Sequence, residues 1–176
     1  MEFKELALKG IIEITPRIFE DERGMFFEAF NDKVFKDNGL DVQFVQDNQS
    51  FSVKNVVRGL HFQKEPFAQG KLVRVISGKV LDIVVDIRKE SATYGQHLKV
   101  ILDGKKNNMV YVPGGFAHGF TALEDTVFIY KCTHLYNKSA ESGILWSDPE
   151  LGIDWEVENP ILSEKDKFLP LFSQIN

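Results

Sequence analysis

Short apolar runs that alternate with polar residues recur along this chain, and they constrain its fold more than any other feature. Two of these runs, Leu72–Ile76 and Val80–Ile87, are rich in Val, Ile and Leu and are separated by Ser77-Gly78. Apolar alternation bounded by glycine is typical of β-strands joined by tight turns. We therefore predict a β-hairpin over residues 72–87 with its turn at Gly78.

Further segments share this pattern at short, regular spacing, which favours an antiparallel sandwich or barrel over alternating βα units. The predicted strands are Gly10–Ile14, Met25–Phe30, Val42–Phe51, Val56–Phe62, Leu98–Leu102, Asn108–Val112, Phe116–Leu123 and Thr126–His134. A short helix is predicted over Asn31–Asn38, with Asn31 as its N-cap, and another begins at Ser163. The region after Pro149 has few strand signals, so we expect it to wrap over an all-β barrel as irregular chain.

Length, charge and cysteine content narrow the classes of function. The 176 residues predict one domain, 1–176, because a single core accommodates this length. A net charge of −5 argues against a nucleic-acid binder, but it leaves room for an anionic small molecule beside local basic side chains. Cys132 is the only cysteine, so no internal disulfide is possible. The charged start of the chain and the shortness of its apolar runs predict no signal peptide and no membrane span, and hence a cytoplasmic protein.

Three stretches carry polar residues suited to chemistry. Arg58 and His61 lie three residues apart, so in a regular strand they would face opposite sides. Gly59 between them is a candidate bulge that would bring both to one side. Lys71 opens a predicted strand, and His118 lies among small residues that a ligand can approach closely.

Histidines in a β-barrel raise the alternative of a metal-dependent cupin oxygenase. Cupin metal sites place two histidines one residue apart and a carboxylate shortly after them. Here His61 is followed by Phe62 and Gln63, so the compact ligand cluster is missing. We therefore predict no metal site.

Nine stretches, in order along nearly the whole chain, resemble the dTDP-4-dehydrorhamnose 3,5-epimerase family. They are Asp21-Glu22-Arg23-Gly24 with Phe26 and Glu28, Gln46-Asp47-Asn48, Arg58–Gln63, Gln69–Arg74, Val84–Arg88, Phe116–Phe120, Tyr130-Lys131, Gly152–Trp155 and Leu162–Asp166. The resemblance implies a cupin-like jelly roll and a homodimer. It also implies epimerisation of dTDP-4-dehydro-6-deoxyglucose at C3 and C5 to dTDP-4-dehydro-L-rhamnose, in dTDP-rhamnose biosynthesis.

The implied reaction needs a base, an acid on the opposite face of the sugar and a donor to the enolate oxygen. It needs no metal and no cofactor, because the C4 ketone acidifies both neighbouring C–H groups. By resemblance, His61 is the base and Asp166 orients it. Tyr130 is the acid, and Lys71 with His118 stabilises the enolate.

The nucleotide half of the substrate is implied to contact a second set of residues. These are Arg23, Phe26, Glu28, Gln46, Asn48, Arg58, Glu141 and Lys165. Arginine suits bidentate contact with phosphate, and Phe26 can stack on the thymine. The N-terminal segment is implied to cross to the partner subunit, so that Arg23, Phe26 and Glu28 act in the neighbour's site.

Two stretches depart from the family pattern, at Pro113-Gly114-Gly115 and at His134-Leu135-Tyr136. The second follows Tyr130 and can shape the acid side of the pocket. An epimerase of a dTDP-4-keto-6-deoxy sugar that acts at C3 only is therefore an open alternative. A non-catalytic nucleotide-sugar binding module is another, although binding alone requires none of His61, Asp166 and Tyr130.

Overall fold

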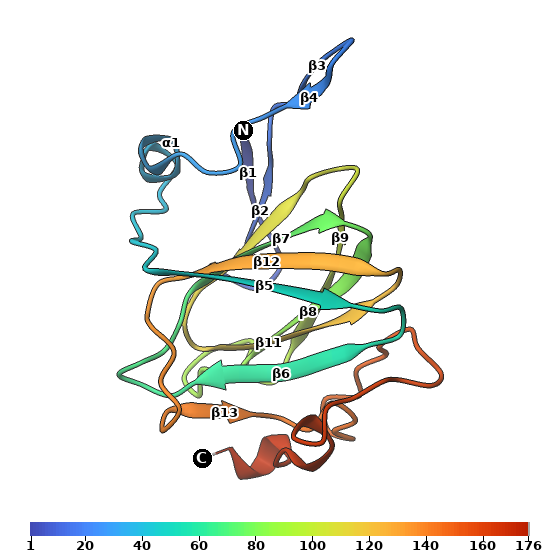
Figure 1. Ribbon diagram of the computed structural model, residues 1–176. Helices are drawn as coiled ribbons and strands as arrows, with labels where there is room; N and C mark the ends of the chain where they lie inside the picture. Colours follow the sequence, from blue (N-terminus) through green and yellow to red (C-terminus); the bar gives the residue numbers. More distant parts are fainter. Residues whose placement is uncertain (176) are drawn as a thin grey trace.

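A computed structural model describes residues 1–175, and the last residue of the predicted domain, Asn176, lies outside the described residues. Two antiparallel sheets face each other, and a small hairpin projects beyond one end (Figure 1). The first sheet contains β1 (Glu2–Glu5), β2 (Ile12–Thr15), β5 (Gln46–Ser52), β7 (Lys71–Ser77), β10 (Met109–Val112) and β12 (Thr126–Cys132). The second contains β6 (Val57–Gln63), β8 (Lys79–Asp86), β9 (His97–Asp103), β11 (Phe116–Ala122) and β13 (Glu141–Gly143).

The spatial order of the strands is β1-β2-β10-β7-β12-β5 in the six-stranded sheet and β13-β6-β11-β8-β9 in the five-stranded sheet. Neighbours in space are therefore mostly distant in sequence, as in a jelly roll. The predicted fold class, an all-β antiparallel jelly roll with short peripheral helices, is confirmed.

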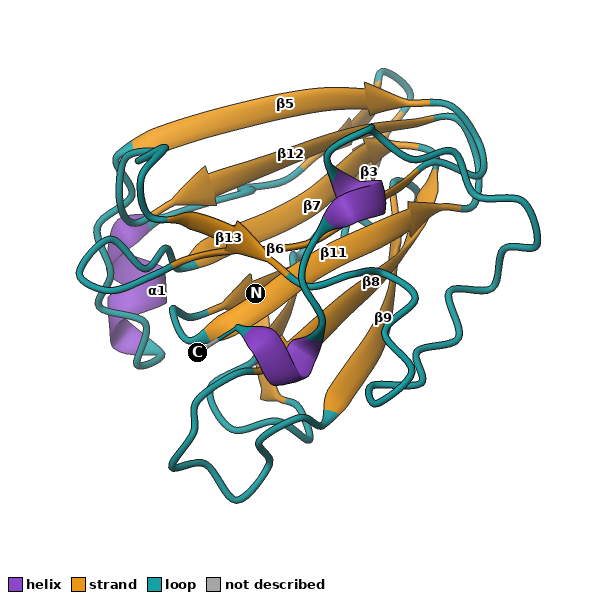
Figure 2. Ribbon diagram, turned by 90° about the horizontal axis from the view of Figure 1, so that it is seen from below, coloured by secondary structure: helices purple, strands orange, loops and turns teal. Residues whose placement is uncertain are grey.

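Strand β8 shows how the layers are packed. Val80 and Val84 face the core between the sheets, and Leu81, Ile83 and Val85 face the opposite side. That opposite side is covered by the C-terminal region, which includes the 3-10 turns η1 (Asp166–Phe168) and η2 (Phe172–Gln174) (Figure 2). The prediction that the chain after Pro149 wraps over the barrel is therefore confirmed.

The predicted hairpin over residues 72–87 is wrong, because β7 and β8 belong to different sheets. β7 pairs with β10 and β12, whereas β8 pairs with β9 and β11, so neither strand has a free edge for the other. Gly78, with φ of +86°, turns the chain from one sheet to the other. Apolar alternation specifies a strand and its two faces, but it does not specify which strand becomes its neighbour.

The peripheral elements differ from prediction mainly in length. Strand pairing begins only at Gln46 rather than at Val42, and Met25–Phe30 is reduced to β4 (Gly24–Phe26), which pairs with β3 (Phe19–Asp21) in an exposed hairpin. The short polar strands β1 and β13 were not predicted, since they carry no apolar alternation.

The predicted start at Asn31 is confirmed, whereas the helical turn predicted to begin at Ser163 begins three residues later, at Asp166, with Lys165 as its N-cap. Helix α1 spans Asp32–Asp37, and the side chain of its N-cap, Asn31, accepts a hydrogen bond from the Val34 N–H at 3.2 Å. Ser163 Oγ accepts a hydrogen bond from the Asp166 N–H at 3.1 Å, and η1 follows from there.

Candidate active site

A cavity of about 330 Å³ lies between the inner faces of the two sheets. Strands from both sheets supply its lining, which brings together six of the residues singled out in the sequence. They are Asn48, Arg58, His61, Lys71, His118 and Tyr130. The strands of His118 and Tyr130 follow each other in the sequence, which predicts an antiparallel meander. They belong instead to opposing sheets, although both side chains do line one cavity.

Gly59 brings Arg58 and His61 to the same side of β6. The register between β6 and β11 shifts beside it, and its φ is +129°. A Cβ at this position would lie 2.6 Å from the Cα of Gly119, so only glycine fits between the strands. The predicted bulge is confirmed, and it places the guanidinium and the imidazole in one cavity.

His61 and Asp166 form a close pair. The distance from His61 Nε2 to Asp166 Oδ1 is 2.6 Å, and the Asp166 side chain is buried while that of His61 is 33% exposed. Burial by itself raises the pKa of Asp166, but hydrogen bonds from His61, the Gly59 backbone and Ser163 hold that pKa below its ordinary value. An ionised carboxylate only accepts hydrogen bonds, so Nε2 is the donor and Nδ1 of the neutral ring is free to accept a proton.

His118 forms a second pair of the same kind. Its Nε2 lies 2.8 Å from Oδ1 of Asp82, a fully buried residue on the neighbouring strand β8. The His118 ring is itself buried and stacks near Phe128. The sequence analysis did not predict Asp82 as the partner of His118. The available signal was its position as a charged, inward-facing residue within the apolar run Val80–Ile87.

Lys71 and Tyr130 lie on the six-stranded sheet, across the cavity from the two histidines. Lys71 Nζ is 5.9 Å from the centroid of the Tyr130 ring. Burial lowers the pKa of Lys71 and raises that of Tyr130. Both pKa shifts favour the uncharged forms of Lys71 and Tyr130. A charged group in this cavity is therefore stabilised only when a group of opposite charge or a hydrogen-bond partner lies beside it.

Basic and amide side chains lie both in this cavity and at its rim, by which we mean the neighbouring residues Gln46, Tyr136, Glu141 and Lys165. Arg58 donates to Ser52 Oγ at 3.0 Å and to the Phe51 carbonyl at 3.3 Å. Gln46 donates to Asn48 Oδ1 at 2.9 Å, and its own Oε1 accepts from the Tyr136 N–H at 2.8 Å.

The remaining rim residues are held together by one carboxylate. Glu141 pairs with Lys165 at 2.5 Å and accepts a hydrogen bond from the Tyr136 hydroxyl at 3.0 Å. These contacts tie β13 to the segment that carries Asp166. Lys165 and Glu141 therefore lie near the His61–Asp166 pair, although neither lines the cavity.

Of the predicted binding residues, Asn48 and Arg58 line this cavity. Six others do not: Gln46, Glu141 and Lys165, and also Arg23, Phe26 and Glu28. Arg23 lies in the turn of the β3–β4 hairpin, paired with Asp21 at 2.6 Å and with its side chain 85% exposed. Phe26 is 68% exposed, and Glu28 accepts a hydrogen bond from Asn31 at 2.8 Å. Their prediction as contributors to a partner's site is addressed below.

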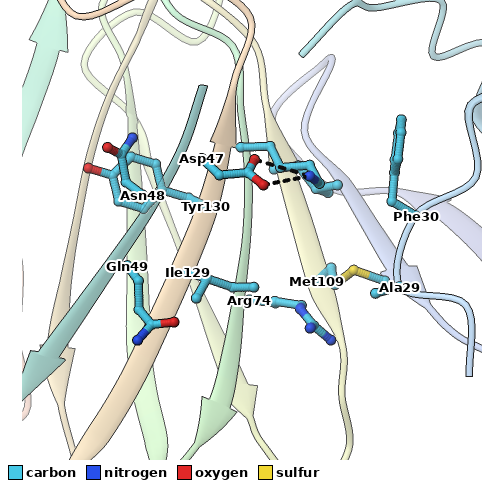
Figure 3. A pocket seen from close by; sticks show the side chains of 11 residues that line it. Ala29, Phe30, Asp47, Asn48, Gln49, Arg74, Met109, Ile129 and Tyr130 are labelled. Atoms are coloured by element: carbon cyan, nitrogen blue, oxygen red, sulfur yellow. Dashed lines mark hydrogen bonds and ion pairs between the residues drawn. The ribbon is translucent and has the colours of Figure 1, made fainter. Parts of the chain in front are cut away.

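A larger hollow of about 430 Å³ lies on the outer face of the six-stranded sheet (Figure 3). Its one carboxylate, Asp47, is already paired with Lys131 at 3.0 Å, and the guanidinium of Arg74 lies over the Phe27 ring at 5.5 Å. It contains neither His61 nor His118, both of which line the smaller cavity.

Within residues 1–175, no three side chains of His, Cys, Asp or Glu form a group that could hold a metal ion. His61 and His118 direct Nε2 at separate carboxylates instead.

Over residues 1–175, no helix is long and apolar enough to cross a membrane.

Comparison with known proteins identifies the family. The family model described as dTDP-4-dehydrorhamnose 3,5-epimerase matches residues 5–174. The chain belongs to the dTDP-4-dehydrorhamnose 3,5-epimerase family. An epimerase of this name from Methanothermobacter thermautotrophicus is 52% identical over 169 residues, which cover 94% of this chain and 91% of that protein.

Solved structures of epimerases agree with this assignment. The dTDP-4-dehydrorhamnose 3,5-epimerase of Elizabethkingia anophelis superposes with a TM-score of 0.95 at 44% identity, covering 100% of this chain and 98% of that one. A dTDP-6-deoxy-D-glucose-3,5-epimerase from Legionella pneumophila, solved in complex with dTDP-4-keto-L-rhamnose, has a TM-score of 0.95 at 42% identity and covers 99% of this chain and 94% of that one. The family resemblance predicted from the sequence is therefore confirmed.

Proposed function

We propose that this family member epimerises dTDP-4-dehydro-6-deoxyglucose at C3 and C5 in the cavity between the two sheets. The Legionella relative was solved with a dTDP-linked 4-keto sugar, which supports the same substrate class here. The observation that carries the mechanism is the His61–Asp166 pair, because it leaves Nδ1 of His61 as a proton acceptor.

The first step is removal of a proton from carbon. His61 takes the proton from C3 or C5, the C–H electron pair forms the C=C bond of an enolate, and the C4 oxygen gains the negative charge. Asp166 stabilises the imidazolium that results. Lys71 Nζ is the donor for the developing oxyanion, and one such donor is typically worth about 3–4 kcal/mol. His118, whose Nε2 faces Asp82, adds a second donor at Nδ1 when its ring is an imidazolium.

The second step returns a proton to the opposite face of the sugar. His61 belongs to the five-stranded sheet and Tyr130 to the six-stranded sheet, so a ring bound between the sheets has one group on each side. Tyr130 donates its phenolic proton to the carbon as the enolate collapses to the ketone. Exchange with water then restores the proton of Tyr130 and removes that of His61.

The nucleotide is proposed to lie along the rim. Arg58 contacts the diphosphate, and Gln46, Asn48, Glu141 and Lys165 hold the rest of the nucleotide. We further infer a homodimer in which the exposed hairpin carries Arg23, Phe26 and Glu28 to the partner's rim. The support for this is the exposure of Phe19, Met25 and Phe26, at 52%, 54% and 68% of their surfaces. The single domain and the cytoplasmic location stay predictions.

Incubation with dTDP-4-keto-6-deoxyglucose in D2O tests the proposed function. We expect an L-configured 4-keto product that contains deuterium at both C3 and C5 by NMR. Deuterium at C3 alone would establish the narrower epimerase, and no exchange at either carbon would exclude an epimerase. Full activity is expected in EDTA, whereas a metal-dependent cupin oxygenase would lose activity.

A further inference from the structure

We propose that Gln63 is a positioning residue for the rim of the cavity. Its side-chain amide fixes the segment Leu135–Asn137, which we call the strap, where that segment crosses from one sheet to the other. This inference rests on the proposed function, in which the rim holds the nucleotide. Gln63 does not line the cavity, so it acts on the nucleotide only through the strap and the rim residues that the strap holds.

The side-chain amide of Gln63 is buried and binds backbone atoms of two loops. Its Oε1 accepts a hydrogen bond from the Asn137 N–H at 2.7 Å. Its Nε2 donates to the Phe67 carbonyl at 2.7 Å and to the Leu135 carbonyl at 3.3 Å. Two carbonyls need a donor and one N–H needs an acceptor, and an amide supplies both. An ionised carboxylate at this position would lack the donors.

The strap is held from the other sheet as well. Between Leu135 and Asn137, the Tyr136 N–H donates to Oε1 of Gln46 at 2.8 Å. Gln63 is the last residue of β6 in the five-stranded sheet, and Gln46 is the first residue of β5 in the six-stranded sheet. The connection from β12 to β13, on the left of Figure 1, crosses between the sheets here. One amide side chain from each sheet therefore fixes three consecutive residues.

This crossing lies at one end of the cavity between the sheets. His61 and Asn48 line the cavity, and they lie two residues before Gln63 and two residues after Gln46 on the same strands. Residues two apart in a strand point to the same face of the sheet. The two amides therefore continue the walls of the cavity toward the rim, and a shift of the strap moves the rim rather than the strands that carry the catalytic groups.

The strap also holds the carboxylate of the rim. Glu141 lies opposite Gln63 in the register of β13 and β6, and it accepts a hydrogen bond from the Tyr136 hydroxyl at 3.0 Å. Tyr136 is 53% exposed, although both its backbone N–H and its hydroxyl are bound. An exposed side chain held at both ends is ordered before a ligand arrives, and a preordered site loses less conformational entropy on binding.

Gln63→Met keeps the length of the side chain and removes its three hydrogen bonds. The strap must then be ordered when the nucleotide binds, so we expect the Kd for dTDP to rise about tenfold. KM for the dTDP-sugar should rise with it. We expect kcat at saturation to stay within about twofold, because bound substrate restores the rim and the catalytic groups lie on the strands. Calorimetry and saturation kinetics measure the two effects.

Asn108→Leu is the matched control, because Asn108 and Gln63 are both 7% exposed and neither lines the cavity. Asn108 also accepts one hydrogen bond, from the Asp103 N–H at 3.1 Å, and donates two, to the Ile101 carbonyl at 2.9 Å and to Glu13 at 3.0 Å. Both variants should lose stability, but only Gln63→Met should lose affinity for dTDP. Unchanged dTDP affinity in Gln63→Met, or an equal loss in both variants, would overturn the proposal.

Amide hydrogen exchange of the wild-type protein tests the strap without any variant. In the absence of nucleotide, the N–H groups of Tyr136 and Asn137 are expected to exchange at least about tenfold more slowly than in an unstructured peptide. Exchange of Asn137 at the unstructured rate contradicts the proposal even if Gln63→Met does not fold. Wild-type protein that binds no dTDP would instead contradict the proposed function, which separates the two failures.

Discussion

His61 and His118 lie opposite each other in the register of β6 and β11, and each directs Nε2 at a different buried carboxylate. Asp166 reaches His61 from the C-terminal segment, whereas Asp82 reaches His118 from within the sheet. The His61 side chain is 33% exposed and that of His118 is 8% exposed. The more exposed imidazole, that of His61, can exchange its proton with water, as a base must after each turnover. The buried imidazole of His118 is held in one orientation, which suits a hydrogen-bond donor to the enolate oxygen.

Replacing His61 should abolish chemistry and preserve binding. His61→Asn keeps a polar side chain of similar size but cannot accept a proton from carbon. We expect turnover to fall by at least ~10²-fold with near-normal dTDP affinity. Steady-state kinetics and calorimetry check this, with His97→Asn on β9 as a control that keeps full turnover. Near-normal turnover in His61→Asn would remove His61 from the mechanism.

Arg58 should contribute to the affinity of the protein for dTDP. Arg58→Ala removes the guanidinium proposed to contact the diphosphate, so dTDP binding should weaken by roughly 1.5–3 kcal/mol. The loss should be larger at low salt, where screening is weaker. Calorimetry at two ionic strengths measures it, and Arg74→Ala, in the outer hollow, is the control. An unchanged affinity in Arg58→Ala means that the nucleotide lies elsewhere.

Tyr130 should separate proton removal from proton return. Tyr130→Phe keeps the ring and its packing beside Phe128 but removes the acid. The enolate would still form on the His61 side, so solvent deuterium should enter unepimerised substrate faster than product appears. Wild type should show the opposite order.

A D2O time course by NMR and mass spectrometry checks this prediction. Tyr111→Phe, on the outer face of the six-stranded sheet, serves as the control and should behave as wild type. If Tyr130→Phe loses deuterium uptake and epimerisation in equal proportion, Tyr130 is not the acid, and Tyr136 or a bound water becomes the candidate.

Asp86 should make stability depend on acid pH. Burial by itself raises the pKa of this carboxyl, but hydrogen bonds from Arg88, Ser91 and Thr93 hold it far below its ordinary value of 3.8. A lowered pKa in the folded state adds stability that is complete well above pH 3.8 and is lost as pH falls below it. The difference in unfolding free energy between wild type and Asp86→Asn should therefore shrink below about pH 4. Urea titrations at pH 7 and pH 3 measure it, and a constant difference would contradict the assignment.

Gly59 should be the most sensitive backbone position of the site. Gly59→Ala places a Cβ 2.6 Å from Gly119 Cα at a φ of +129°, so the strands must separate. Gly39→Ala also places alanine at a positive φ, +86°, but its Cβ meets no atom within 4 Å. We expect Gly59→Ala to lower stability by about 2 kcal/mol or more beyond Gly39→Ala, measured by chemical denaturation. Equal losses would mean that β6 and β11 can relax around the methyl group.

The sequence by itself determined the local features of this protein. Apolar alternation predicted most strands of the barrel, and Asn31 marked the start of helix α1, because caps and side-chain direction depend on near neighbours. Gly59 between Arg58 and His61 predicted a bulge for the same reason. The family motifs predicted the residues that line the cavity, including His61, Lys71 and Tyr130.

Only the tertiary structure decided which elements meet. β7 and β8 follow each other in sequence yet lie in different sheets, and the strand of Tyr130 faces that of His118 across the core. Asp82 became the partner of His118 through this arrangement, although the two are 36 positions apart in the chain. Alternation tells which side of a strand is buried, but the choice of neighbour depends on how all the buried faces pack together at once, and no local pattern encodes that.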